Sequence, residues 1–514
     1  MRKNKQHGVA GALLAGALLG GLMTAPGAHA VDFRVKGVWI AMLEYGDGGS
    51  FVRKDREGKN VQGWGRWGED RFEAKNRVRL QLDAAVSDAL SGSVYFEIGG
   101  ATWGRARNGG ALGADGQITK IKHSYLDWSL PGTGIKTRMG LQRIFLPDFV
   151  TDASQVFDAD VAGISVAAPL TEHLSLTAFW ARAFNDNWAA PDGRSGWLDN
   201  ADFFGLLLPV TSEDMRLTPW ALLGTIGKNA FRHGNGHFYS RNSEGSYGIG
   251  LSPSAYRFDG RESSLAHATA FWAGLTGEIT AARPLRLAWS AAWGSVSTGD
   301  AALDRHGWYA SALAEYALDW GTPGIYGWYS SGDDGDPTNG SERMPTIEAN
   351  NESTSSVAGF GTLGTWTLGR DTLLGSTLVG TWGLGLRVCD ISFFEDLRHT
   401  IHINYYQGTN SAGMARHIKG AGGPDIVRPN GPDFNTANYY GLYLTDRDRA
   451  MEVGIMSSYA LHENLKLLVE ANYIALWLDN STDVWGGYHA GGRRYAANST
   501  EDAWNMNVSF IYKF

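Results

Sequence analysis

The sequence predicts an all-β fold, a transmembrane antiparallel β-barrel of about 16 to 18 strands. Three observations lead to this prediction. Polar and apolar residues alternate with a period of two in many segments, short turns alternate with long polar segments, and no run in the mature chain reaches the roughly 18 consecutive apolar residues of a membrane helix. A chain that crosses a membrane without such helices must do so as a closed barrel.

The composition suits a large β-protein rather than a helical enzyme. The chain has 514 residues, of which 68 are Gly, and 12% are Phe, Trp or Tyr. Charged residues make up 19%, below the usual share of about 25%. Many glycines and aromatic residues with few charges indicate many turns and a wide apolar surface. No domain boundary or low-complexity linker divides the chain.

The first 30 residues have the pattern of a secretory signal peptide. A basic segment precedes an apolar segment, residues 9–23, which is rich in Ala, Gly and Leu. The small-x-small pattern AHA then predicts cleavage after Ala30. An uncleaved membrane anchor is the alternative, but the apolar run is short and interrupted by Gly. Residues 31–514 are expected to form the barrel as one domain.

The charge balance argues against nucleic-acid binding. The formal net charge is −8, with 45 basic and 53 acidic residues. Removal of the signal peptide takes Arg2, Lys3 and Lys5 with it, so the basic residues fall to 42 and the net charge to −11. An acidic chain of this kind is not expected to have a nucleic-acid partner.

Motifs for covalent or metal chemistry are missing from the sequence. Cys389 is the only cysteine, so neither a disulfide framework nor a thiolate metal site is expected. We find no Gly-rich phosphate loop, no nucleophile elbow and no zincin motif. The sequence therefore predicts no catalytic residue, no metal and no cofactor, and the protein is not expected to be an enzyme.

The early strands show the alternation most clearly. In RFEAKNRVRLQLD, residues 71–83, charged residues occupy most odd positions and apolar residues most even ones. The apolar set is expected to face lipid and the charged set an aqueous lumen, because the reverse would place cations against lipid at about 2–4 kcal/mol each near the midplane. The basic residues predicted to line the lumen are Arg34, Lys36, Arg71, Lys75, Arg77, Arg79, Lys136 and Arg138.

Connections between the strands alternate in length. Short turns are predicted around residues 87–92, 131–134, 171–173, 212–214, 281–284, 320–324, 393–396 and 462–464. The long polar segments are 44–70, 104–116, 184–200, 227–264, 331–356, 409–446 and 479–500. This asymmetry is typical of outer-membrane barrels, which have short periplasmic turns and long extracellular loops.

The chain ends on an amphipathic segment, NMNVSFIYKF. Val508, Phe510 and Phe514 share one face, and Asn507 and Ser509 share the other. A last strand that ends in Phe514 resembles the signal that the outer-membrane barrel-assembly machinery reads, so this machinery is an expected partner. An ordinary edge strand at the end of the chain is the alternative.

Several stretches resemble a known family, the trimeric outer-membrane porins of sulfate-reducing bacteria. They are VDFRVKGVW, RFEAKNRVRLQLDAAVSDALSGSVYFEIG, GGALGADGQ with HSYLDW, DVAGI, SSGDDGDPTNGSERMPTI, TLGRDTLLGSTLVGTWGLG and HINYYQGTN. The resemblance runs from about residue 31 to 410 and includes the last strand, but is looser in the loops at 184–265 and 409–446. It implies a water-filled barrel that forms a homotrimer in the outer membrane of a Gram-negative bacterium.

The segment 144–163 follows the fifth predicted strand and carries several carboxylates. They are Asp148, Asp152, Asp158 and Asp160. In trimeric porins the loop at this place folds into the barrel and narrows it, so the resemblance implies a constriction loop here. We expect its carboxylates to face the basic wall around Arg77 and Arg79, which would create a transverse field that favours ions and dipolar solutes. An ordinary surface loop is the alternative.

The expected function is that of an outer-membrane porin, a passive diffusion channel for small hydrophilic solutes and ions. Selection would come from pore size and from the charge pattern of the lumen. A solute-specific channel is the first alternative, and a barrel enzyme and a surface adhesin are the others. Outer-membrane lipid is the expected surrounding. The preferred ion sign stays open, because the early strands are basic while the mature chain is acidic.

Overall fold

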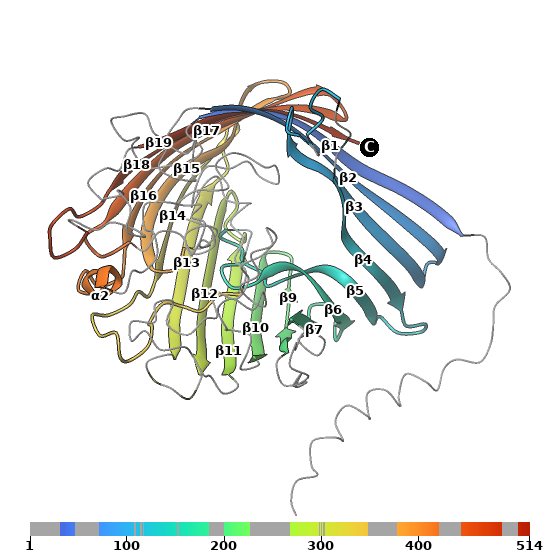
Figure 1. Cartoon of the computed structure of the whole chain (residues 1–514). Coiled ribbons are helices and arrows are strands. Elements are labelled where there is room, and N and C mark those ends of the chain that lie inside the picture. Colours follow the sequence, from blue (N-terminus) through green and yellow to red (C-terminus); the bar gives the residue numbers. More distant parts are fainter. Residues whose placement is uncertain are drawn as a thin grey trace, which may run out of the picture.

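The protein is a closed antiparallel β-barrel (Figure 1). The computed structural model describes residues 31–46, 71–106, 109–113, 116, 118–151, 154–184, 200–226, 268–297, 299, 301, 304–347, 378–420, 444–485 and 502–514. The sheet order follows the chain, and β1 pairs with both β2 and β19, which closes the barrel. The strands are β1 (Asp32–Gly46), β2 (Arg71–Ser87), β3 (Leu90–Thr102), β4 (Thr119–Ser129), β5 (Lys136–Phe145), β6 (Asp158–Pro169), β7 (Ser175–Phe184), β8 (Ala201–Leu207), β9 (Val210–Thr211), β10 (Met215–Ile226), β11 (Ala268–Ile279), β12 (Leu285–Ser297), β13 (Arg305–Tyr316), β14 (Thr322–Ser330), β15 (Thr381–Phe394), β16 (Leu397–Gly408), β17 (Arg449–His462), β18 (Leu465–Trp477) and β19 (Ala503–Lys513).

The 19 strand segments described form a barrel of 18 strands, because two segments share one position in the sheet. β8 and β9 both pair with β10, so they are two pieces of one interrupted barrel strand. The break between them falls at Leu208 and Pro209. Proline has no N–H to donate to a ladder, which accounts for the interruption. The predicted range of about 16 to 18 strands is therefore confirmed at its upper limit.

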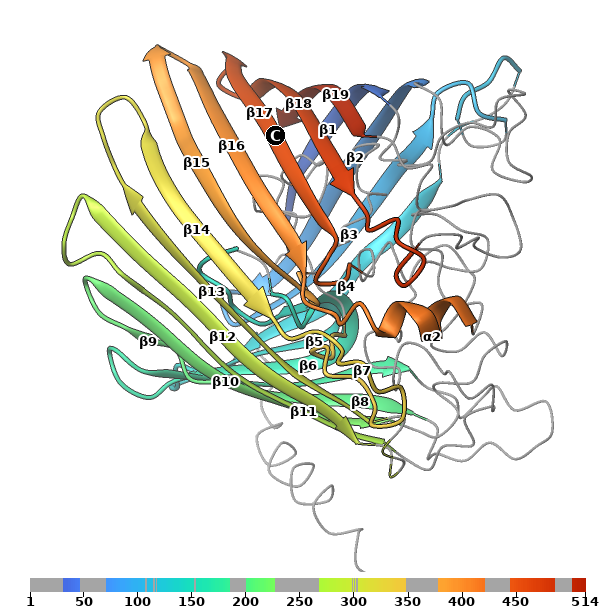
Figure 2. The same ribbon diagram turned by 90° about the vertical axis from the view of Figure 1, so that its left-hand side faces the viewer.

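The two ends of the barrel differ in the length of their connections, as predicted. At one end, the connections are residues 88–89, 130–135, 170–174, 212–214, 280–284, 317–321, 395–396 and 463–464. Figure 2 shows these tight turns at one end and α2 (Met414–Gly420) at the other. We call them the short-turn end and the long-loop end. Among the described residues, no helix is long and apolar enough to cross a membrane.

The last strand shows the predicted separation of its two faces. Met506, Phe510 and Tyr512 are exposed on the outside of the barrel, whereas Asn507 and Ser509 are fully buried towards the inside. The ladder with β1 continues to the end of the chain, because Gly37 and Phe514 exchange backbone hydrogen bonds of 2.8 and 3.1 Å. A Cβ at Gly37 would lie 2.7 Å from the Phe514 ring, so the glycine leaves room for this ring at the seam.

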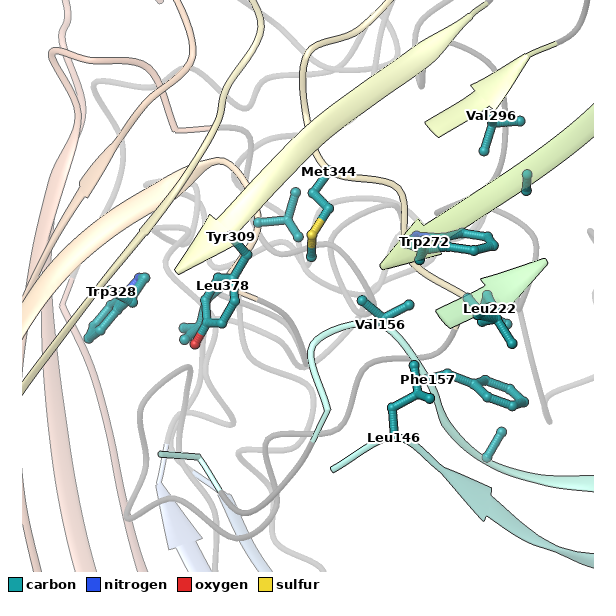
Figure 3. Packing of buried hydrophobic residues seen from close by; sticks show 14 of the residues in the cluster. Leu146, Val156, Phe157, Leu222, Trp272, Val296, Tyr309, Trp328, Met344 and Leu378 are labelled. Atoms are coloured by element: carbon teal, nitrogen blue, oxygen red, sulfur yellow. The ribbon is translucent and has the colours of Figure 1, made fainter. Parts of the chain in front are cut away.

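The barrel interior is partly filled by protein, which corrects the expectation of a lumen filled by water alone. Inward-facing aromatic side chains on β7–β14 are buried under segments that fold in from the long-loop end (Figure 3). The infolded residues include Leu146, Val156 and Phe157 after β5, and Met344 and Leu378 between β14 and β15. The prediction assumed that inward positions are polar. On this side of the barrel they are apolar, and apolar side chains facing water would favour being covered.

Candidate functional site

The inward face of β1–β5 carries ion pairs between neighbouring strands. Arg79 donates to Glu97 at 2.9 Å, and the Nε atom of Arg77 lies 3.7 Å from the same carboxylate. Lys75 lies between Glu44 at 2.9 Å and Glu73 at 3.2 Å. Each of these three cations therefore has a carboxylate of the same wall beside it.

Nearer the short-turn end, the same wall continues with more exposed pairs. Arg138 forms a bidentate pair with Asp127 at 2.7 and 2.9 Å and lies 3.9 Å above the ring of Tyr125. Lys36 lies 3.7 Å from Asp83. We call the inward ion pairs of β1–β5 the charged arc. Its members are Lys36, Glu44, Glu73, Lys75, Arg77, Arg79, Asp83, Glu97, Asp127 and Arg138.

The other predicted basic residues lie at exposed strand ends or outside the described residues. Arg34 is exposed at the start of β1 and pairs with its neighbour Asp32 at 2.8 Å. Lys136 is exposed at the start of β5. The side chain of Arg71 lies outside the described residues, as do Asp152 and Ala30. Cleavage after Ala30 and a role for Phe514 in assembly therefore stay predictions.

The opposite wall carries a second set of charges that the sequence analysis missed. Arg216, Glu278, Arg286, Glu315 and Arg387 alternate in sign across β10, β11, β12, β13 and β15. Arg286 bridges the two glutamates at 3.0 and 2.8 Å, Arg387 lies 2.6 Å from Glu315, and Arg216 pairs with Glu278. We call these five residues the Arg–Glu ladder. Four of them lie near the predicted short turns. The alternation of residues along their strands would have placed them on the inward face of the barrel.

In three of the inward ion pairs the cation is more exposed than its carboxylate. The side chains are 50% and 9% exposed for Arg216 and Glu278, 28% and 10% for Arg286 and Glu315, and 64% and 21% for Lys36 and Asp83. The carboxylates lie against the wall while the cationic groups extend towards the lumen. A solute beside these three pairs therefore meets the positive groups first, with the negative charge set behind them, whereas Arg138 and Asp127 are about equally exposed.

The loop after β5 is held against the opposite wall. β5 ends at Phe145 and β6 begins at Asp158, so the loop spans residues 146–157 rather than the predicted 144–163. Its Phe149 amide donates to the Thr276 hydroxyl at 2.9 Å, and Arg286 of the ladder donates to the Phe149 carbonyl at 2.8 Å. We call residues 146–157 the infolded loop. A ladder cation thus also fixes the position of this loop.

Two further contacts tie the infolded loop to segments from the long-loop end. The Leu378 amide donates to the Gln155 side chain at 2.9 Å, and the Ile347 amide donates to the Val156 carbonyl at 2.9 Å. The rings of Phe157 and Phe203 lie 6.0 Å apart. Hydrogen bonds and aromatic packing therefore hold one loop against several separate elements. Figure 3 shows Leu146, Val156 and Phe157 of the loop in the same apolar cluster as Leu222 and Trp272.

Asp148 does not face the charged arc. Its carboxylate is buried and accepts hydrogen bonds from the amides of Val150 at 2.9 Å and Thr151 at 3.1 Å, within the infolded loop. Burial raises the pKa of the Asp148 carboxyl to about 6, although these donors favour its charged form. The residue stabilises the turn of the loop and presents no exposed charge to the lumen.

Asp158 and Asp160 also have other partners than the predicted ones. Asp158 pairs with Arg143 at 2.6 Å, and Asp160 contacts His123 at 2.6 Å and Lys122. Arg143 is the neighbour of Asp160 across the β5–β6 ladder, on the strand face opposite to the buried Gln142 and Ile144. The contacts described for these aspartates are therefore with Arg143, Lys122 and His123 rather than with Arg77 or Arg79, and the His123 ring that Asp160 contacts stacks on Tyr95 at 5.2 Å. The carboxylates of this segment are evident from the sequence, but their direction depends on contacts with distant residues.

The fold and lining together define a class, the transmembrane β-barrel with a charged lumen and an infolded loop. Solved structures of this architecture come from outer-membrane proteins of Pseudomonas aeruginosa. The structure of OccK2 (OpdF) in complex with glucuronate has a TM-score of 0.50 and 11% identity, covering 94% of this chain and 98% of that one. OprD has a TM-score of 0.48 and 10% identity, covering 93% and 94%, and OccK11 (OpdR) has a TM-score of 0.48 and 12% identity, covering 94% and 96%.

The likeness to OccK2 (OpdF) concerns the fold alone, because the identity is 11%. No family model matches the sequence. No curated protein matches it either.

Proposed function

We propose that the protein is an outer-membrane porin of a Gram-negative bacterium, a passive diffusion channel for small hydrophilic solutes and ions. A closed barrel of 18 strands with an apolar outer surface and inward ion pairs supports this proposal. Water is needed beside the short-turn half of the charged arc, since the exposed ammonium of Lys36 and guanidinium of Arg138 keep their hydration. Selection by pore size and by lumen charge requires no covalent chemistry.

The channel favours anions over cations. The observation that supports this preference is the unequal exposure within the ion pairs, above all Arg216 with Glu278 and Lys36 with Asp83. Cations that extend from the wall attract anions into a water-filled pore, while a carboxylate set behind them is partly neutralised. The negative net charge of the mature chain does not oppose this preference, since local groups dominate once distant charges are screened beyond about 8–10 Å.

Reversal potentials in planar bilayers under a KCl gradient test this proposal. The wild-type channel should be anion-selective. Glu97→Gln removes the carboxylate shared by Arg77 and Arg79, and Arg138→Gln removes a cation, so they should shift the permeability ratio in opposite directions. One charge about 8 Å from the ion path in water changes its energy by about 0.5 kcal/mol, roughly a factor of two.

Asp214→Asn is a matched control, because it removes one carboxylate in the turn outside the lumen, 3.8 Å from Arg283. Its reversal potential should stay close to the wild-type value. A cation-selective wild-type channel would contradict the anion preference. Absence of any conductance from folded protein would count against a channel of either sign.

A solute-specific channel is the second candidate. The packing of the infolded loop against β7–β14 favours it, since protein that fills part of the lumen narrows the path left for solutes. Conductance that saturates and is blocked by one solute would identify this case. We also propose the homotrimer that the family resemblance implies, and conductance in groups of three would support it.

A further inference from the structure

The outward face of β17 is apolar along most of its length and ends at a cation. The exposed apolar residues on this face are Met451, Val453, Ile455, Tyr459 and Leu461. Arg449 occupies the next outward position at the long-loop end and is also exposed, whereas Ala450 and Glu452 between them are fully buried towards the inside. The alternation along the strand therefore places Arg449 on the outside of the barrel.

The position of Arg449 along β17 corresponds to a membrane boundary. Ten residue steps separate Met451 from Leu461, which at about 3.3 Å per residue and a tilt of about 40° make a rise of about 25 Å. The outward apolar band of a membrane barrel is also about 25 Å tall. Arg449 lies one outward position beyond this band, at the depth where hydrocarbon ends and lipid head groups begin.

The cross-strand neighbours of Arg449 offer it a ring but no negative charge. Arg449 stands opposite Gln407 of β16 and Trp477 of β18, and Figure 2 shows these three strands side by side. Its Cζ atom lies 5.8 Å from the centroid of the Trp477 ring, which is 45% exposed. The Gln407 amide has other partners, since its oxygen accepts from the Tyr405 hydroxyl at 3.2 Å and its nitrogen donates to the Asp446 carbonyl at 2.6 Å.

Arginines that lie over aromatic rings elsewhere in the described structure each have a carboxylate partner. They are Arg138 with Asp127, Arg143 with Asp158, Arg182 with Asp202, Arg216 with Glu278 and Arg387 with Glu315. Arg449 differs from them, because its side chain forms no ion pair within the part of the chain that the structure describes. A guanidinium remains charged at any working pH, so an anion from outside the chain is favoured at this position.

We propose that Arg449 and Trp477 bind the phosphate of an anionic lipid head group in the leaflet on the long-loop side. The planar fork of the guanidinium matches two phosphate oxygens, and the Trp477 ring is suited to the boundary between acyl chains and head groups. A free phosphate ion would gain nothing from that apolar surface, so the depth of the pair favours a lipid. This inference goes beyond the proposed channel function. It requires only that the barrel spans a membrane, and it would hold for a general or a specific pore.

Native mass spectrometry of the folded chain in detergent tests the site, with dipalmitoyl phosphatidate as the anionic lipid and dipalmitoyl phosphatidylcholine as the neutral one. Wild-type protein should bind phosphatidate more tightly. Arg449→Gln should raise the Kd for phosphatidate about five-fold or more, because it removes the charged donors to the phosphate. Arg283→Gln is the matched control, since it removes a 72% exposed cation at the short-turn end. It should leave the Kd unchanged.

Equal binding of the two lipids, or an equal loss from Arg449→Gln and Arg283→Gln, would overturn the proposal. Displacement of phosphatidate by the same concentration of inorganic phosphate would indicate a site for a free anion and would also overturn it. Arg449→Lys keeps the charge without the planar fork, so its Kd should lie between those of the wild type and Arg449→Gln. Heat-modifiable migration shows that each variant is folded. Channel conductance, measured in parallel, separates a failed lipid site from a failed channel.

Discussion

The charged arc of β1–β5 and the inward face of β7–β14 belong to one barrel but are lined differently. The first carries ion pairs such as Arg79 with Glu97, and the second carries buried aromatic residues such as Phe203 and Trp272. We call the second the packed arc. Charges need water or opposite charges beside them, and aromatic faces are stabilised by protein cover. The inward residues of each arc therefore decide what fills the barrel next to it.

The infolded loop lies against the packed arc for the same reason. It presents Leu146, Val156 and Phe157, all buried, to that wall. Burying each such side chain contributes roughly 1.5–3 kcal/mol. The exposed half of the charged arc, at Lys36 and Arg138, offers no comparable gain, because covering these cations would remove their hydration. The pore is expected to run along the charged arc, with the loop as its opposite boundary.

The largest expected effect comes from breaking the packed arc at Trp272. This residue is fully buried, and its indole donates to the Pro345 carbonyl at 2.8 Å. Trp272→Ala removes the surface on which the infolded segments pack and should cost about 3–5 kcal/mol of unfolding free energy. The loosened segments should also raise the single-channel conductance. Thermal unfolding in detergent and bilayer recording measure the two effects.

Trp293 provides the matched control for this prediction. It lies on the neighbouring strand β12 but is exposed on the outward face. Trp293→Ala should leave single-channel conductance unchanged, because the side chain points away from the described infolded segments. If both substitutions changed conductance equally, the packed arc would not control the width of the pore.

A smaller effect is expected from the charge of Asp148 in the infolded loop. Burial raises the pKa of its carboxyl from 3.8 to about 6. Ionisation therefore opposes the folded position of the loop: its stability is greatest below about pH 4, falls as the pH rises towards 6, and is constant above. A shift of about two units corresponds to roughly 3 kcal/mol. The thermal midpoint should be higher at pH 4.5 than at pH 7.5 by an amount that depends on this residue.

Asp148→Asn isolates that contribution. The amide oxygen still accepts from Val150 and Thr151, but the side chain no longer titrates. The difference between the two pH values should therefore be smaller in the variant than in the wild type. An identical pH dependence in both proteins would show that Asp148 is not the group that couples the loop to pH.

The sequence was sufficient to predict the barrel but not the segments that fold into its interior. A period of two fixes which residues face outwards, and it placed Met506 and Phe510 on the outside and Asn507 on the inside correctly. The alternation of loop length also gave the strand number closely. Neither signal says whether an inward position meets water or another segment. Trp272 and Phe203 were therefore not recognised as a surface for infolded loops.

The candidate site was predictable to the same extent. Local alternation identified the inward cations of β2, Arg77 and Arg79, but their partner Glu97 comes from the next strand and depends on register. The direction of the infolded loop was not predictable. Its position depends on contacts such as Arg286 with Phe149, which are 137 residues apart in sequence. Long-range contacts of this kind leave no local pattern.

The smallest expected effect comes from Lys36, at the short-turn end of the charged arc. Its side chain is 64% exposed and lies 3.7 Å from Asp83, so Lys36→Ala should change the unfolding free energy by less than about 0.5 kcal/mol. Its effect on the reversal potential should be smaller than that of Glu97→Gln, because no described infolded segment lies beside it to narrow the pore there and salt screens an exposed charge beyond about 8–10 Å. Bilayer recordings of both variants under one KCl gradient make the comparison direct. A shift from Lys36→Ala as large as that from Glu97→Gln would place the selective part of the pore at the short-turn end, where the infolded loop has no influence on it.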